Sequence, residues 1–479
     1  MEVTPVRIAG ELVTTEPTWS VTNPFDGTVV GTLPECDVDA VDTACRAAAA
    51  ALARDDFPAH RRAEVLDSAA ARLRADREVF AARICAEAGK PITAARGEVD
   101  RCLDTLRFAA AEARGLVGEM VPMDASASGE GRLGFALRVP IGVVAAITPF
   151  NFPLNLVAHK VAPAIAAGCP VVLKPAPQAP LSAVAFVELL VAAGLPPDWV
   201  SVVTAPGPEI GQALVAHEVP RMVTFTGSTA VGWAIAAAAP RKKVALELGS
   251  NAPVIVEPDV DVAAVAAKIA TGGYTYAGQS CISVQRVLVA RQVADALRDA
   301  LQEAVAALPV GDPTDERTVV GPMISPEHTQ RVLSWIEDAA AAGAQVLTGG
   351  KVDDGVLLPT LVVDAPLDGD LWRQEAFGPV VVMRAYDTFD EAVALANDSD
   401  LGLHAGLFTS DVGRALEAAR RLDFGGVVVN EVPTVRVDQQ PYGGVRDAGN
   451  TREGPAYTVR EMTELRFVSL APPPRSPQR

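Results

Sequence analysis

Three residues in this sequence have side chains that could act together on a carbonyl carbon. Cys281 lies in "YAGQSCISVQRV", between small polar neighbours, and a thiolate is a strong nucleophile near neutral pH. Asn151 lies in "TPFNFPLN", directly after an apolar run, and its amide could donate a hydrogen bond to a developing oxyanion. Glu247 lies at the end of an apolar run in "LELGSNAP", where partial burial would raise the pKa of its carboxyl and suit it to activate water.

Each of these residues also has an ordinary structural explanation. Free cysteine is among the most buried residue types, so Cys281 could be one more small core residue in an alanine-rich chain. Asn151 and Glu375, the latter in "QEAFGPV", could simply form turns. Glu247 could be a carboxylate that is satisfied at a strand end. The residues therefore gain meaning only from their combination and their order along the chain.

A possible phosphate-binding turn lies in "FTGSTAVG", residues 225–232. The pattern predicts a strand, a Gly-Ser-Thr turn and the start of a helix. Gly227 would let the backbone approach a pyrophosphate, and Ser228 with the helix N-terminus would supply hydrogen-bond donors. The segment lacks the G-x-G-x-x-G fingerprint of dinucleotide-binding proteins, so a plain helix N-cap is the alternative.

Taken in order, these motifs resemble those of the aldehyde dehydrogenase superfamily. The resemblance extends from "TNPFDGTVVG" to "PYGGVRDAGNTREG", and Glu247 precedes Cys281 by 281 − 247 = 34 residues, as in that family. "LELGSNAP" and "GQSCISVQRV" look like the branch that handles lactaldehyde and other small functionalised aldehydes. The resemblance implies that Cys281 is the nucleophile, Asn151 the oxyanion donor and Glu247 the general base. It also implies hydride transfer to a nicotinamide, followed by hydrolysis of a thioester.

The same resemblance implies NAD or NADP as the cofactor. Lys174 of "LKPAPQAP" would contact the adenosine ribose, Glu375 would hold the nicotinamide ribose, and Phe377 would pack near the nicotinamide ring. The family often has Glu three residues after this lysine, whereas this chain has Pro177. Because a 2′-phosphate meets less repulsion without that carboxylate, the sequence is compatible with NADP as well as NAD.

Residues near the catalytic candidates bear on the substrate. Ser280 precedes the cysteine where relatives acting on phosphorylated or phosphonate aldehydes tend to have Arg, and Phe152, next to the asparagine, is apolar. Both features disfavour a strongly anionic aldehyde. Arg107 and Arg436 could line a substrate pocket, but the expected role of each is pairing at the surface. His159, on a predicted apolar helix, is expected to be a core residue.

Two sets of buried strands must position these residues. Residues 37–116 follow a helical pattern. From residue 141, short runs such as "IGVVAAI" and "RMVTFTG" are apolar throughout, as in parallel strands buried on both faces. A second set of such runs begins at "APVIVEP" and continues to "GGVVVNE". Strands alternating with helices predict an α/β fold, with a Rossmann-like cofactor domain, an α/β catalytic domain and a small β flap.

The predicted domain boundaries follow these changes of pattern. The cofactor-binding domain is expected in residues 1–120 and 141–247, and the catalytic domain in residues 248–455. Residues 121–140 could form a polar-tipped hairpin, and residues 456–470 include a late lone strand. Because exposed strands usually find a partner, these two segments predict an oligomerisation flap in a homodimer or homotetramer.

Composition argues against several other classes of protein. The net charge is 41 − 59 = −18, whereas nucleic-acid and anionic-membrane surfaces need clustered Lys and Arg. The six cysteines are scattered singly, so neither a metal site nor a disulfide framework is expected, and reduced thiols fit a cytoplasmic protein. No signal peptide or membrane span is expected, and residues 471–479 are expected to be a disordered tail.

The sequence therefore predicts a non-acylating, NAD(P)-dependent aldehyde dehydrogenase that acts on a small-molecule aldehyde. Among enzymes, the alternative is a CoA-acylating semialdehyde dehydrogenase, which passes its thioester to CoA and does without a base such as Glu247. Outside enzymes, the alternative is a catalytically idle binding or structural protein on the same fold. The presence of the cysteine, the asparagine and both glutamates argues against that alternative.

Overall fold

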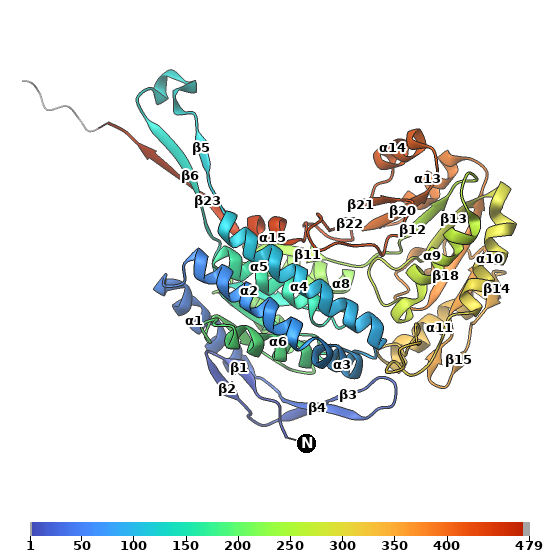
Figure 1. The fold of residues 1–479 in the computed structure, drawn as a ribbon, viewed down its shortest axis with the longest axis horizontal. Coiled ribbons are helices and arrows are strands. Elements are labelled where there is room, and N and C mark those ends of the chain that lie inside the picture. Colours follow the sequence, from blue (N-terminus) through green and yellow to red (C-terminus); the bar gives the residue numbers. More distant parts are fainter. Residues whose placement is uncertain (1, 473–479) are drawn as a thin grey trace, which may run out of the picture.

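Two α/β sheets dominate the computed structural model, which describes residues 2–472 (Figure 1). The first sheet has five parallel strands in the order β11-β10-β7-β8-β9. They form from the apolar runs after residue 141, and nearly all of their residues are buried because helices pack on the sheet. The strands are β7 (Val144–Ile147), β8 (Val171–Lys174), β9 (Val200–Val202), β10 (Met222–Thr226) and β11 (Lys243–Glu247).

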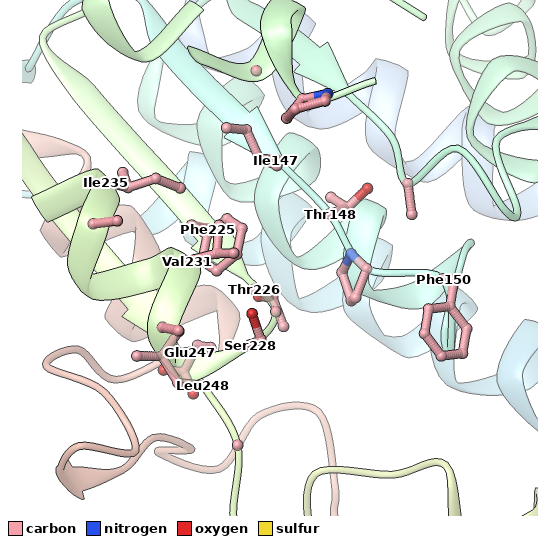
Figure 2. Close-up of a pocket in the computed structure, with 18 of the residues that line it drawn as sticks. Ile147, Thr148, Phe150, Phe225, Thr226, Ser228, Val231, Ile235, Glu247 and Leu248 are labelled. Atoms are coloured by element: carbon pink, nitrogen blue, oxygen red, sulfur yellow. The ribbon is translucent and has the colours of Figure 1, made fainter. Parts of the chain in front are cut away.

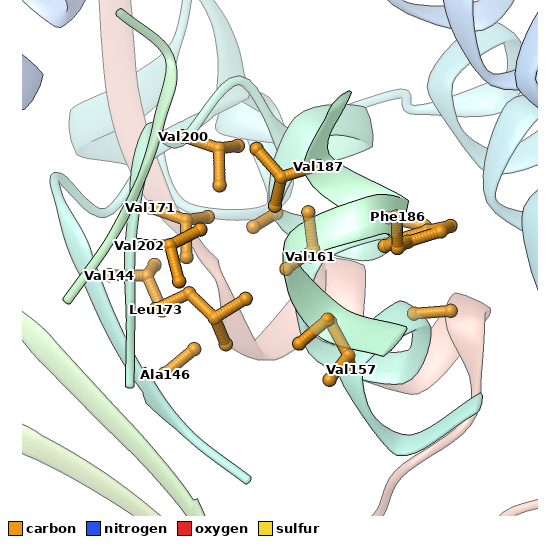
Figure 3. Close-up of a cluster of buried hydrophobic side chains, with 14 of the residues drawn as sticks. Val144, Ala146, Val157, Val161, Val171, Leu173, Phe186, Val187, Val200 and Val202 are labelled. Atoms are coloured by element: carbon orange, nitrogen blue, oxygen red, sulfur yellow. The ribbon is translucent and has the colours of Figure 1, made fainter. Parts of the chain in front are cut away.

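Helices before and between these strands complete the first core. Side chains of α5 and α6, such as Val161 and Val187, gather with strand side chains such as Val171 and Val202 (Figure 3). The helical pattern predicted for residues 37–116 is confirmed. The helices of this region are α1 (Val38–Arg54), α2 (Ala59–Ala75), α3 (Arg77–Ala88), α4 (Ile92–Gly115), α5 (Asn155–Ala167), α6 (Leu181–Ala192), α7 (Glu209–Ala216) and α8 (Thr229–Ala238).

The second sheet has seven strands in the order β14-β17-β18-β13-β12-β20-β21. All neighbouring pairs are parallel except β14 and β17, which are antiparallel at one edge. The apolar runs predicted between "APVIVEP" and "GGVVVNE" form β12 (Pro253–Val256), β13 (Arg286–Ala290), β18 (Val380–Tyr386), β20 (His404–Phe408) and β21 (Gly426–Val429). The strands β14 (Gln345–Thr348) and β17 (Thr360–Val363) were not predicted. The helices of this region are α9 (Val262–Tyr274), α10 (Ala294–Ala306), α11 (Pro326–Ala341), α12 (Asp370–Arg373), α13 (Phe389–Asn397) and α14 (Val412–Arg421).

A three-stranded antiparallel sheet projects from the body of the molecule (Figure 1). Its central strand β6 (Leu133–Pro140) pairs along its whole length with β23 (Thr463–Leu470), and β5 (Glu119–Val121) pairs with its other side. The predicted hairpin segment and the predicted late strand therefore belong to one sheet. Leu465 is 50% exposed and Phe467 is 53% exposed, so this sheet leaves apolar side chains uncovered.

Smaller elements complete the chain. The helix α15 (Pro455–Glu461) lies in the segment expected to form the flap, but it packs against α4 and α5, with Val459 fully buried. Short two-stranded sheets were not predicted: they pair β1 (Val6–Ile8) with β2 (Glu11–Val13), β3 (Thr18–Thr22) with β4 (Val29–Pro34), β15 (Val352–Asp353) with β16 (Val356–Leu357), and β19 (Leu401–Gly402) with β22 (Val445–Arg446).

The described residues hold neither a membrane-spanning helix nor a cluster of metal-binding side chains. Across residues 2–472 we find no helix with the length and apolar character needed to span a bilayer. The same residues hold no group of three or more His, Cys, Asp or Glu side chains that could bind a metal ion. Most of the predicted tail, from residue 473 on, lies outside the described residues.

Candidate active site

A tight loop presents Cys281 between α9 and β13. Three consecutive residues shortly before this cysteine have left-handed backbone conformations, namely Tyr276 (φ 57°), Ala277 (φ 52°) and Gly278 (φ 65°). A Cβ atom at Gly278 would collide with the carbonyl oxygen of Gly378, so this position requires glycine. Non-glycine residues in this region cost energy and are commonly held at functional sites. The strain therefore marks the Cys281 loop as a segment whose shape the surrounding packing enforces.

Asn151 is held against this loop from the first sheet. It follows β7, is 3% exposed, and its Nδ2 donates a hydrogen bond to the carbonyl oxygen of Gln279, at 2.9 Å. An amide nitrogen has two hydrogens, so the second remains for another acceptor near Cys281. The asparagine is thereby oriented by the chain segment that carries the cysteine.

A buried ion pair fixes the segment after Asn151. The Glu98 carboxylate accepts hydrogen bonds from the backbone N–H groups of Leu154 and Asn155, at 2.9 and 3.0 Å. Lys90 pairs with the same carboxylate at 2.5 Å, and its ammonium lies 3.5 Å from the ring centroid of Phe152. These contacts satisfy N–H groups at the start of α5, which would otherwise lack partners, and so stabilise the loop that holds the asparagine.

Glu247 ends β11 as an almost completely buried carboxyl. It is 4% exposed, and neither of its oxygens has a hydrogen-bond partner among the described residues. Burial, together with the negative charge of Glu453, raises the pKa of Glu247 well above 4.5. Although burial also acts on Glu453, positive charges at His159, Lys160 and Arg436 lower the pKa of that carboxyl to about 2. Glu247 is thus the carboxyl of this pair with the raised pKa, and a raised pKa makes its carboxylate a stronger base.

The Cys281 thiol has one hydrogen-bond partner in the part of the chain that the structure describes, Tyr442. Its Sγ lies 2.8 Å from the tyrosine hydroxyl oxygen. Burial raises the pKa of the Cys281 thiol to about 12, whereas the hydrogen bond from Tyr442 acts to lower it. Sequence analysis quoted the "PYGG" segment but did not single out this tyrosine, because nothing in the local pattern showed that it would reach the cysteine.

A cavity of about 1120 Å³ lies beside these residues. Figure 2 shows part of it, with Phe225, Val231 and Ile235 on one side and Thr148 and Phe150 on another. The structure brings every residue predicted to contact the cofactor, and all three catalytic candidates, to this one cavity. They are Lys174, Pro177, Gly227, Ser228, Glu375, Phe377, Asn151, Glu247 and Cys281.

The donors and acceptors in this cavity suit a dinucleotide. Ser228 precedes the first residue of α8, and its side chain makes no capping hydrogen bond, so the hydroxyl and the helix N-terminus can receive a phosphate. Lys174 makes only a 3.4 Å contact with the carbonyl oxygen of Pro175. Glu375 accepts a hydrogen bond from the backbone N–H of Ser250 at 3.0 Å, and burial raises its pKa to about 7. Its remaining oxygen can accept from a ribose hydroxyl.

A smaller pocket of about 40 Å³ shares Cys281 and Glu247 with the large cavity. One water needs about 10–15 Å³, so this pocket admits only a few non-hydrogen atoms. Phe152 and Ser280 line it, as do residues that were not predicted. Among these residues are Arg101, Thr434, Tyr442 and Glu453.

Arg436 lines the smaller pocket, so its expected surface role is wrong. Its side chain is 5% exposed and pairs with Glu453 at 2.8 Å. Its guanidinium carbon lies 3.7 Å from the ring centroid of Tyr442, and its Nε is buried with no hydrogen-bond partner among the described residues. The segment around Arg436 folds inward against the first sheet, a tertiary contact that sequence spacing does not reveal.

Arg107, in contrast, does not reach either pocket. It is exposed on α4 and faces Asp104 at 3.5 Å. Arg101, six residues earlier on α4, points about 120° away around the helix, lines the smaller pocket and binds Asp438 at 2.8 and 3.2 Å. His159 is buried, as expected, but its Nε2 lies 2.8 Å from Asp438, so it belongs to a polar network.

Comparison with known sequences finds one family profile and several relatives that match nearly the whole chain. A sequence profile described as "Aldehyde dehydrogenase family" matches residues 13–468. The chain is 43% identical over 463 residues to 3-sulfolactaldehyde dehydrogenase of Priestia megaterium, with 97% of each chain covered. It is 36% identical to lactaldehyde dehydrogenase of Methanocaldococcus jannaschii, with 94% of this chain and 97% of that one covered.

Solved structures match over almost the whole chain as well. Aldehyde dehydrogenase 21 from Physcomitrella patens, in complex with the reaction product succinate, superposes with a TM-score of 0.94 at 39% identity and covers 98% of both chains. An NADP-dependent glyceraldehyde-3-phosphate dehydrogenase from Bacillus halodurans, complexed with NADP, superposes with a TM-score of 0.95 at 35% identity. That comparison covers 98% of this chain and 100% of the other.

Proposed function

The chain belongs to the aldehyde dehydrogenase family and is an NAD(P)-dependent enzyme that oxidises aldehydes, and we propose that it prefers short aldehydes with an acidic group at the far end. The observation that carries this proposal is the pair of guanidinium groups, Arg101 and Arg436, in the small pocket that Cys281 also lines. The CoA-acylating and catalytically idle alternatives are not favoured.

The proposed roles of the catalytic residues follow from their positions. The Cys281 thiolate forms a bond from Sγ to the aldehyde carbon, and the carbonyl oxygen becomes negatively charged. Asn151 Nδ2 and the backbone N–H of Cys281 donate hydrogen bonds to that oxygen, and one such donor contributes about 3 kcal/mol. A nicotinamide held in the large cavity would supply the acceptor for the hydride that leaves this carbon. Glu247 then takes a proton from water, the resulting hydroxide attacks the thioester, and Sγ leaves as the acid is released.

Both arginines keep N–H groups available for a substrate. Arg101 binds Asp438 through Nε and Nη2, which leaves Nη1. Arg436 binds Glu453 through Nη2, which leaves Nη1 without a hydrogen-bond partner among the described residues. A planar guanidinium matches an anionic oxygen pair well. This proposal differs from the expectation that a strongly anionic aldehyde is disfavoured. That expectation rested on Ser280 and Phe152, which are sequence neighbours of the catalytic candidates, whereas the two arginines reach the pocket from distant parts of the chain. The names of the sulfolactaldehyde relative and of the succinate complex agree with an acidic substrate group.

A matched pair of arginine variants tests the substrate class. For the wild type, we expect kcat/KM to be at least about tenfold higher for a four-carbon aldehyde ending in a carboxylate than for butanal. Arg101→Gln should lower this preference by about ten- to a hundredfold, since a hydrogen bond to a charged group contributes about 1.5–3 kcal/mol. Arg107 lies on the same helix but outside the pocket, so Arg107→Gln is the control and should leave the preference for the carboxylate-bearing aldehyde unchanged. An equal preference in all three proteins would contradict the proposal.

Several finer properties of the enzyme are part of the same proposal. Pro177 and Lys174 at the large cavity favour the use of NADP alongside NAD. The exposed apolar side chains of the sheet formed by β5, β6 and β23 favour a homodimer or homotetramer. The division into cofactor-binding, catalytic and flap regions is proposed as the sequence predicted it, except that α15 packs with the cofactor-binding helices. Six free cysteines favour a cytoplasmic location.

A further inference from the structure

Tyr442 reaches Cys281 from a segment 161 residues away in the sequence. Its hydroxyl oxygen lies 2.8 Å from Sγ, its side chain is 2% exposed, and among the described residues the hydroxyl makes no other hydrogen bond. A buried tyrosine hydroxyl usually finds a protein oxygen as its partner. Here the partner is the sulfur that the proposed reaction requires as an anion.

The surroundings of the Tyr442 ring keep this hydroxyl a donor. Burial raises the pKa of Tyr442 well above 10, so the phenol retains its proton near neutral pH. The guanidinium carbon of Arg436 lies 3.7 Å from the ring centroid, and a cation over an aromatic face draws electron density from the ring. His404 packs against the ring at 4.9 Å between centroids, at an interplanar angle of 64°. Arg436 and His404 therefore both contact the ring, whose hydroxyl lies against Sγ.

A hydrogen bond from this hydroxyl distinguishes the charged from the neutral form of the sulfur. Hydrogen bonds to an ionised acceptor are roughly twice as strong as those between neutral groups. The same contact therefore stabilises the thiolate more than the thiol. Other charged groups near Cys281 act in both directions, because Glu375 and Glu247 disfavour the thiolate whereas Arg436 favours it.

We propose that Tyr442 is a further catalytic residue, which donates its hydroxyl hydrogen to the Cys281 thiolate and thereby increases the fraction of enzyme with a charged nucleophile. No proton is transferred in this contact, and the phenol stays neutral. The inference rests on the proposed role of Cys281 as the nucleophile. It is tested by the reactivity of the sulfur itself, without an aldehyde and without turnover.

Alkylation by iodoacetamide provides this measurement. The thiolate carries out a displacement in which an S–C bond forms, the C–I bond breaks and iodide leaves, so the rate follows the thiolate fraction. In the full-length protein, the rate at Cys281 is followed by mass spectrometry of its peptide across a range of pH. We expect Tyr442→Phe to react at least about tenfold more slowly near neutral pH, which corresponds to a rise of about one unit in the pKa of the thiol.

A second tyrosine serves as the matched control. Tyr274 is also fully buried, and its hydroxyl donates to the carbonyl oxygen of Thr360 at 2.9 Å. Tyr274→Phe therefore removes a buried hydroxyl without touching Sγ, and its alkylation profile should match that of the wild type. The difference between wild type and Tyr442→Phe should shrink as the pH rises toward the pKa of the thiol, which a purely structural defect would not produce.

The outcomes separate this inference from the proposed function. An unchanged or faster rate at Cys281 in folded Tyr442→Phe would overturn the role of the tyrosine, even if Cys281 is the nucleophile. Turnover that survives in Cys281→Ala would instead overturn the nucleophile. If Tyr442→Phe does not fold, 3-fluorotyrosine in place of Tyr442 keeps the shape and strengthens the donor. The fluorinated protein should then react faster than the wild type, and an equal rate would refute the inference.

Discussion

Replacing Glu247 by glutamine removes the proposed base while keeping the size of the side chain. Both carboxyl oxygens of Glu247 are buried without hydrogen-bond partners in residues 2–472, so the amide loses none of the contacts that the structure describes. Because the acylation step does not need this base, Glu247→Gln should still form the thioester and release one equivalent of NAD(P)H. Hydrolysis of the thioester should then be slow. The loss of a general base costs about 10²–10⁴-fold in rate, or about 3–5 kcal/mol in the barrier.

The pH dependence of stability gives a second measure of the same group. Since burial raises the pKa of Glu247 in the folded protein well above 4.5, the folded state binds more protons than the unfolded state between the two pKa values. The stability that this group contributes is complete below pH 4.5 and is lost as the pH rises through the folded pKa. The loss is at most about 1.4 kcal/mol per pH unit. Glutamine does not ionise, so Glu247→Gln should become progressively more stable than the wild type as the pH rises.

Rapid-mixing absorbance at the NAD(P)H band and thermal unfolding between about pH 5 and 8 test these two expectations. Glu464→Gln is the matched control, because Glu464 is exposed on β23, and it should show neither a burst nor a pH-dependent gain in stability. Steady turnover without a burst in Glu247→Gln would assign the base to another residue. A difference in melting temperature that does not vary with pH would show that the carboxyl is not desolvated as the structure indicates.

Three further predictions concern the nucleophile, the cofactor and the flap. Cys281→Ala should abolish aldehyde oxidation but retain cofactor binding, measured by NAD(P)H fluorescence; appreciable turnover would refute the mechanism. The wild type should use NADP within about tenfold of NAD, a difference of about 1.4 kcal/mol, and Pro177→Glu should shift kcat/KM toward NAD by restoring repulsion of a 2′-phosphate. A thousandfold preference of the wild type for NAD would mean that another residue reads the ribose. Phe467→Glu should reduce the mass measured by light scattering, because it places a charge on the exposed apolar sheet, and a wild type that is already monomeric would contradict the flap.

The sequence alone determined the α/β class and the residues around which the site is built. Runs that are apolar throughout can only be buried on both faces, and this local property was sufficient to predict β7 to β13 along with β18, β20 and β21. β14 was missed because all of its residues are exposed or half-buried, and β17 was missed although it is mostly buried and as long as β7. Asn151, Glu247 and Cys281 were identifiable because each lies in a short motif next to a predicted strand, and the structure brings them to one cavity. Their catalytic roles remain predictions.

Only the tertiary structure decided which charged and hydroxyl groups reach the sulfur. Arg101 and Arg107 lie on the same helix, and their residue types alone do not show which of them faces the pocket. Arg436 and Tyr442 belong to a segment without regular secondary structure, which packs inward against the Cys281 loop. The direction of a side chain in such a segment depends on contacts with residues more than a hundred positions away, and no local periodicity encodes those contacts. For this reason the sequence could predict the nucleophile but not the tyrosine and arginines that surround it.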